Sequence, residues 1–78
     1  MRYYKITQTE NGIDTIVCSD SERTAIKTFN NLFRSLKARA DLVRGVRIEE
    51  TPDSFTFIYP KSERLPEGYV ITLKIEEE

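Results

Sequence analysis

Histidine is absent from the 78-residue sequence, and cysteine occurs only once, as Cys18. Histidine is the commonest general base and the commonest metal ligand in proteins, so its absence argues against an enzyme and against a metal site. A lone cysteine cannot form an internal disulfide, which favours a reducing, cytoplasmic location. We expect Cys18 to be a small packing residue. A reactive thiol at the start of the predicted helix is the alternative.

Long apolar runs are also missing from the sequence. No segment approaches the roughly 18 consecutive apolar residues that a transmembrane helix needs, and the first residues alternate instead of resembling a signal peptide. The three glycines, Gly12, Gly45 and Gly68, are each explained by a predicted turn or helix end, and they form no phosphate-binding loop. We therefore expect no membrane segment, no cofactor and no catalytic residue.

What the sequence does contain is one long amphipathic segment, residues 19–45. On a helical wheel its apolar side chains gather within roughly 60° of Phe29, as expected for a helix that lies on a core. Ser19 and Glu22 have the spacing of a capping box, and Gly45 can adopt the left-handed conformation that ends a helix. The sequence therefore predicts one helix over residues 19–45.

The segment before this helix predicts a β-hairpin. Asn11-Gly12 is the pair typical of a two-residue type I′ turn, because both central positions need a positive φ. This turn pairs Glu10 with Ile13 and, further along, Ile6 with Val17. On that register one face, the natural seat for the helix, carries Tyr4, Ile6, Ile13 and Val17. The other face carries Tyr3, Lys5, Thr7, Asp14, Ile16 and Cys18.

The segment after the helix predicts three more strands. Residues 46–50 and 55–59 alternate on either side of a proline turn, which places Ile48 opposite Phe57, and a last strand covers residues 69–75. The expected fold is α+β. It is a single ββαβββ domain spanning the whole chain, a mostly antiparallel sheet of about five strands with the helix packed on one face. The predicted core consists of Tyr4, Ile6, Val17, Ile26, Phe29, Phe33, Leu36, Ile48, Phe57, Ile71 and Leu73.

Charge is unevenly distributed along a chain that is nearly neutral overall. Residues 21–47 carry seven basic and two acidic side chains, whereas residues 48–78 carry three basic and eight acidic ones. Either the acidic strands lie beside the basic helix, or the two halves form separate outer surfaces. We define the basic stripe as four cations that fall between roughly 80° and 160° on the helical wheel: Arg23, Lys27, Arg34 and Lys37. Such a stripe would fit an acidic partner, a nucleic-acid backbone or an acidic protein surface.

A second candidate surface is the face of the sheet that a single helix cannot cover. By strict alternation, four apolar side chains point to this face and two cations lie among them: Tyr3, Ile16, Ile58 and Val70, with Arg47 and Lys74. Single apolar residues are normal on a surface. Several on one small sheet exceed what a fully solvated face usually shows, which favours burial against a protein partner or a second copy.

We therefore expect a non-catalytic protein-interaction module of the inhibitor or adaptor type, or one that associates with itself as a homodimer. The alternative is a nucleic-acid-associated accessory protein that uses the basic stripe. The acidic second half of the chain and the absence of a base-reading motif count against that alternative. In size and architecture the chain resembles phage-borne inhibitors of host defence such as anti-CRISPR proteins. The resemblance is one of scale, and it implies no site residue.

Overall fold

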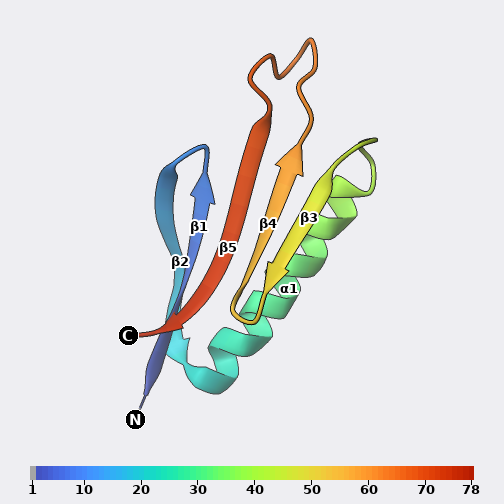
Figure 1. Ribbon diagram of the computed structural model, residues 1–78. Helices are drawn as coiled ribbons and strands as arrows, with labels where there is room; N and C mark the ends of the chain where they lie inside the picture. The colour runs from blue at the N-terminus through green and yellow to red at the C-terminus, as the bar shows by residue number, and fades with distance from the viewer. Residues whose placement is uncertain (1) are drawn as a thin grey trace.

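The computed structural model describes residues 2–78, which form five strands and one helix (Figure 1). The elements are β1 (Tyr3–Glu10), β2 (Ile13–Ser21), α1 (Glu22–Ala40), β3 (Arg47–Thr51), β4 (Ser54–Tyr59) and β5 (Tyr69–Glu77). All neighbouring strands are antiparallel, in the order β2-β1-β5-β4-β3. The predicted α+β fold of ββαβββ order is confirmed.

The last strand, β5, lies in the middle of the sheet and joins the two hairpins. It pairs with β1 on one side and with β4 on the other, so β2 and β3 are the edges. The second hairpin has the predicted register, with Ile48 opposite Phe57. Turn chemistry and hydrophobic alternation agree on that register, which is why it could be predicted.

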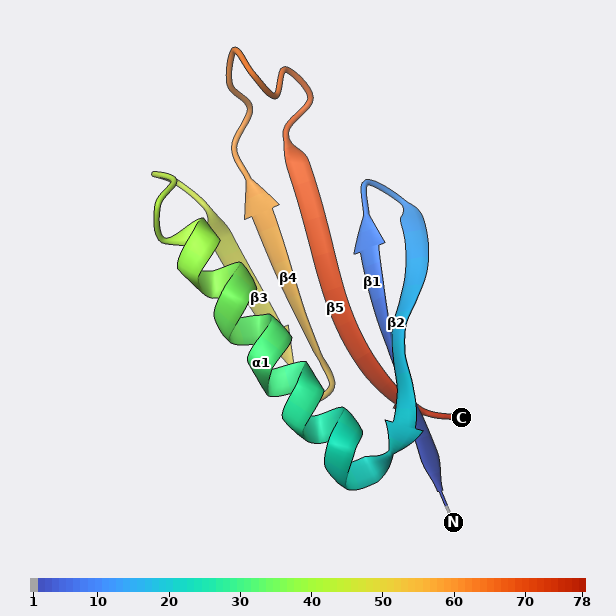
Figure 2. The ribbon, with the colours of Figure 1, turned by 180° about the vertical axis from the view of Figure 1, so that it is seen from behind.

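The helix packs on one face of the sheet, where it contacts β1, β2, β4 and β5. It leaves the end of β2 and crosses obliquely to the start of β3, so it connects the two edges (Figure 2). The turn end of the β1–β2 hairpin stands clear of the helix in this view. The helix therefore covers its own side of the sheet only in part and leaves the opposite side free.

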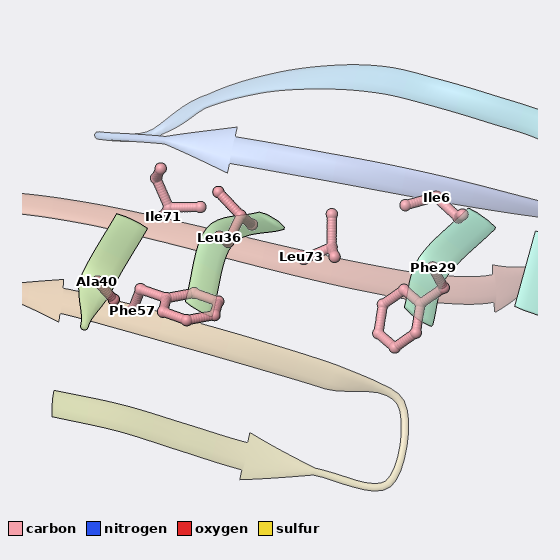
Figure 3. Close-up of a cluster of buried hydrophobic side chains, with 7 residues drawn as sticks. All are labelled: Ile6, Phe29, Leu36, Ala40, Phe57, Ile71 and Leu73. Carbon is pink, nitrogen blue, oxygen red and sulfur yellow. The ribbon is translucent and has the colours of Figure 1, made fainter. Parts of the chain in front are cut away.

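The core lies between α1 and the middle of the sheet (Figure 3). Phe57, Ile6 and Leu73 are its largest fully buried side chains. The Phe33 ring stacks on the Phe55 ring with 3.9 Å between centroids, which extends the core toward β4. The seven residues of the cluster are Ile6, Phe29, Leu36, Ala40, Phe57, Ile71 and Leu73.

Four of the predicted core residues lie outside the buried core. Tyr4 is half-buried and belongs neither to the buried cluster nor to the side chains packed against it. Val17, Ile26 and Ile48 keep 41%, 46% and 40% of their surface exposed. Ile26 lies at the margin of the apolar arc of the helix, 60° from its centre by the predicted spacing of about 100° per residue. Ile48 lies on edge strand β3, which α1 does not contact. Val17 is displaced by an irregularity in β2.

That irregularity is a β-bulge, and it corrects the predicted register of the first hairpin. Glu10 pairs with Ile13 as predicted, but Val17 is left unpaired, and Ile6 pairs with Cys18 instead. An extra residue in one strand moves every later residue of that strand to the other side. Cys18 was therefore assigned to the wrong face: it packs against the core.

The helix is also shorter than the predicted residues 19–45. β2 continues to Ser21, which pairs with Tyr3 of β1, so the predicted capping box does not form and Ser21 makes no side-chain cap. At the other end the helix stops at Ala40. Tighter turns follow, in which Val43 N–H donates to the Ala40 carbonyl at 3.0 Å. The helix is therefore shorter at both ends: residues 19–21 belong to β2, and residues 41–45 form the turns that lead to β3.

Candidate interaction surfaces

We call the side of the sheet that faces away from α1 the open face. All six residues predicted for this side belong to it, because residues directly opposite each other in a ladder share a face. Ile58 pairs with both Arg47 and Val70. The three side chains therefore lie in one row across β3, β4 and β5, where two apolar groups adjoin a guanidinium. Arg47 Nη2 also lies 3.6 Å from Glu49 Oε2.

The other three predicted residues are dispersed over the open face. Ile16 and Lys74 both pair with Thr7, so a threonine separates them. Tyr3 lies at the start of β1, opposite Ser21. Between these positions the face is polar, for example where the hydroxyls of Thr56 and Thr72 hydrogen-bond at 3.1 Å. The open face thus carries one apolar cluster at one end, Ile58 and Val70, rather than a continuous apolar patch.

The basic stripe is exposed along α1. Lys37 Nζ lies 3.4 Å from Asp41 Oδ2. The other three cations of the basic stripe, Arg23, Lys27 and Arg34, form no ion pair within residues 2–78. The C-terminal glutamates pair with residues at the start of the chain instead: Lys5 with Glu76 at 3.6 Å and Arg2 with Glu77 at 3.5 Å. No ion pair therefore joins Arg23, Lys27 or Arg34 to the acidic strands among residues 2–78. Glu50 and Asp53 nevertheless line a groove together with Asn30 of α1, so the acidic second half of the chain lies partly beside the helix.

A third surface was not predicted from the sequence. It is a hollow on the helix side of the sheet, next to the β1–β2 turn, where the helix does not reach. The residues that line it are Gln8, Glu10, Asn11, Ile13, Thr15, Val17 and Tyr69. The sequence held a signal for it. Alternation from Ile6 puts Gln8 and Glu10 on the helix side, and two polar residues in a row there indicate that the core ends before the turn.

Glu10 and Tyr69 form the polar centre of this hollow. The Tyr69 hydroxyl and the Gln8 amide both hydrogen-bond to the Glu10 carboxylate, with 2.6 Å between Gln8 Nε2 and Glu10 Oε1, and they lower the pKa of Glu10. Burial, together with the adjacent Glu10, raises the pKa of Tyr69 to about 12. At neutral pH the carboxylate is ionised and the phenol is protonated.

No group of three potential metal-ligating side chains is found among residues 2–78. In the same part of the chain, no helix has both the length and the apolar composition to cross a membrane. Comparison with known proteins gives no relative, since no protein-family model, no curated protein and no solved structure matches the chain.

Proposed function

We propose that the protein is a non-catalytic interaction module of the cytoplasm, an inhibitor or adaptor that covers a surface of a protein partner. The observation that carries this proposal is the uncovered open face, where Ile58 and Val70 lie next to each other beside Arg47. Burying apolar surface recovers about 25 cal/mol per Å². Arg47 and Lys74 would set the orientation of the partner more than its affinity. The resemblance in scale to phage-borne inhibitors of host defence favours the inhibitor form.

The proposal is tested by placing charge in the apolar cluster. Ile58→Glu combined with Val70→Lys adds two opposite charges at paired positions, so the net charge is unchanged and the sheet can tolerate them. The core lies on the other face, so we expect a native circular dichroism spectrum. The affinity for the specific partner captured from the host's own lysate should fall by about tenfold or more, equivalent to about 1.4 kcal/mol.

The matched control is Leu42→Glu, which changes an exposed apolar residue in the turn after α1, away from the sheet. This variant should retain the partner as the wild-type protein does. Equal retention by the folded double variant would show that the open face is ordinary surface, and the proposal would then be wrong.

The alternative, a nucleic-acid-associated protein, is favoured by the three cations of the basic stripe that form no ion pair in the described part of the chain, residues 2–78. If it were correct, changing Arg23, Lys27 and Arg34 to glutamine would weaken binding evenly across sequences. The log–log salt dependence would also flatten by about one unit for each phosphate that the variant no longer neutralises. Arg39→Gln, on the opposite side of the helix, is the control. We expect little binding at about 150 mM salt. Sub-micromolar, steeply salt-dependent binding to DNA or RNA would favour the alternative.

A further inference from the structure

The two edges of the sheet differ in how they are protected from further pairing. Unpaired backbone groups on an edge strand are a template for another strand, and natural proteins block them with short strands and charges. β3 has five residues and carries Arg47, Glu49 and Glu50. β2 has nine residues, and its first five, Ile13–Val17, include a single charge, Asp14. The β2 edge is therefore the less protected of the two.

The type I′ turn determines which backbone groups of β2 are free. The residues that flank a two-residue turn, here Glu10 and Ile13, exchange hydrogen bonds with each other, and the pattern repeats at every second residue. Thr15 therefore directs its N–H and C=O toward β1. The residues on either side of it, Asp14 and Ile16, direct theirs outward. The bulge at Val17 then ends the regular edge.

The side chains along this free segment are unusually apolar for an exposed edge. Ile13 is 73% exposed and Ile16 is 61% exposed. Ile13 and Val17 lie on the helix side, where both line the hollow beside Tyr69. A strand added here would gain backbone hydrogen bonds and would also cover these side chains.

We propose that this segment pairs antiparallel with the same segment of a second copy, with Thr15 facing Thr15 on the two-fold axis. In this register Asp14 of each copy exchanges hydrogen bonds with Ile16 of the other. On the helix side, Ile13 of each copy faces Val17 of the other. The two sheets then join into one continuous sheet, and the two hollows meet across the axis.

A second copy fits because, of the symmetric registers centred on Asp14, Thr15 or Ile16, one satisfies both the backbone and the side chains. Centring the pair on Asp14 would place two carboxylates directly opposite each other, which is destabilising. Centring it on Ile16 would place Asp14 opposite Cys18, whose backbone groups face β1 after the bulge. Centring it on Thr15 avoids both problems. The pairing uses an edge rather than the open-face cluster, so it holds independently of the proposed function.

The test is the oligomeric state of the whole chain by analytical ultracentrifugation. The paired segment is short, so we expect a weak dimer that is detectable at about 0.1–1 mM protein. Thr15→Lys places two like charges on the axis and should weaken the dimer at least about fivefold. Thr24→Lys adds the same charge on the exposed surface of α1 and should leave the dimer unchanged. A wild-type protein that stays monomeric at 1 mM, or a dimer indifferent to Thr15→Lys, overturns the proposal.

The register has its own test, made in a Cys18→Ser background. Residues that face each other without exchanging hydrogen bonds have Cα atoms about 4.5 Å apart, within the range of a disulfide. Thr15→Cys should therefore cross-link two copies under mild oxidation, whereas Ile13→Cys, which faces Val17, should not. Cross-linking through Ile13→Cys alone would refute this register. Because neither change touches Ile58 or Val70, loss of the dimer and loss of a captured partner are separable results.

Discussion

Tyr69 and Glu10 are ionisable side chains whose proton affinity changes when the chain folds. The pKa of Glu10 is lowered most by the hydrogen bond with the Tyr69 hydroxyl and less by the one with the Gln8 amide. Its contribution to stability is therefore present above its usual pKa of 4.5 and is lost as the pH falls through the lowered value. Tyr69 has the opposite sign. Its pKa rises from 10.0 to about 12, so its contribution is complete below pH 10 and is lost as the pH rises through 12.

For this single residue we predict that Tyr69→Phe reduces the loss of unfolding free energy at alkaline pH. The wild-type protein should lose free energy of unfolding between pH 10 and pH 12, and the variant should lose less of it, because phenylalanine does not ionise. Urea midpoints measured at half-unit intervals over this range check the difference. Tyr3→Phe, at an exposed position on the open face, is the control and should follow the wild-type protein. Parallel curves for the wild-type protein and Tyr69→Phe would contradict the role given to Tyr69.

Among the elements, the β1–β2 turn does more than reverse the chain. Asn11 has φ 47°, and Gly12 has φ 86°, as the type I′ turn requires. The turn is also attached to β5. The Asn11 N–H donates to the Val70 carbonyl at 3.0 Å, and Asn11 Oδ1 accepts from the Val70 N–H at 3.0 Å. The asparagine therefore fixes both the hairpin and its junction with the central strand.

This double role gives a prediction for two substitutions at one position. Asn11→Gly keeps the positive φ but removes the side-chain acceptor, and it should cost about 0.5–1.5 kcal/mol in the free energy of unfolding. Asn11→Asp keeps an acceptor oxygen at the same place and should cost clearly less. Chemical denaturation of both variants distinguishes the two contributions. A larger loss for Asn11→Asp would mean that the hydrogen bond to Val70 contributes little.

The elements that the sequence predicts well are those in which two signals agree. The Asn11-Gly12 turn and the pairing of Ile48 with Phe57 each combine turn chemistry with hydrophobic alternation. The bulge at Val17 has no such signal, because its residue type is as suitable for a regular strand as for a bulge. The start of the helix was misplaced for a related reason. Its predicted cap at Ser19 lies in a segment that pairs with β1 in the sheet instead of starting the helix, so the tertiary context overrides the local helix signal.

For the whole molecule, sequence could predict the side of the sheet for each candidate residue but not their neighbours. Alternation placed Tyr3, Ile16 and Val70 on the open face from local information alone. Whether they meet depends on strand order, which is a property of the complete chain. Because β5 lies between β1 and β4, Val70 adjoins Ile58 but is far from Tyr3. The hollow beside Tyr69 depends likewise on where the helix crosses the sheet.

The central position of β5 predicts that its removal separates the two halves of the sheet. Residues 1–64 contain both hairpins and the helix but lack β5, the strand that pairs with both β1 and β4. We expect this fragment to be largely unfolded by circular dichroism. A peptide of residues 65–78 should restore the native spectrum, because the cut lies in an exposed loop. The same peptide with Leu73→Asp, at a fully buried position, is the control and should fail. A fragment that is native by itself would contradict this role for β5.

The same arrangement determines when the protein can fold during its synthesis. Each hairpin and the helix can form from nearby residues as the chain leaves the ribosome. β1 and β4, however, cannot complete their pairing until β5 has been synthesised, because β5 lies between them in the sheet and follows both in the chain. Until β5 emerges, both strands have unpaired edges and the core lacks Ile71 and Leu73. Exposed edges and apolar surface in unfinished chains favour aggregation. Slow translation of β5 would therefore prolong the period in which nascent chains can aggregate.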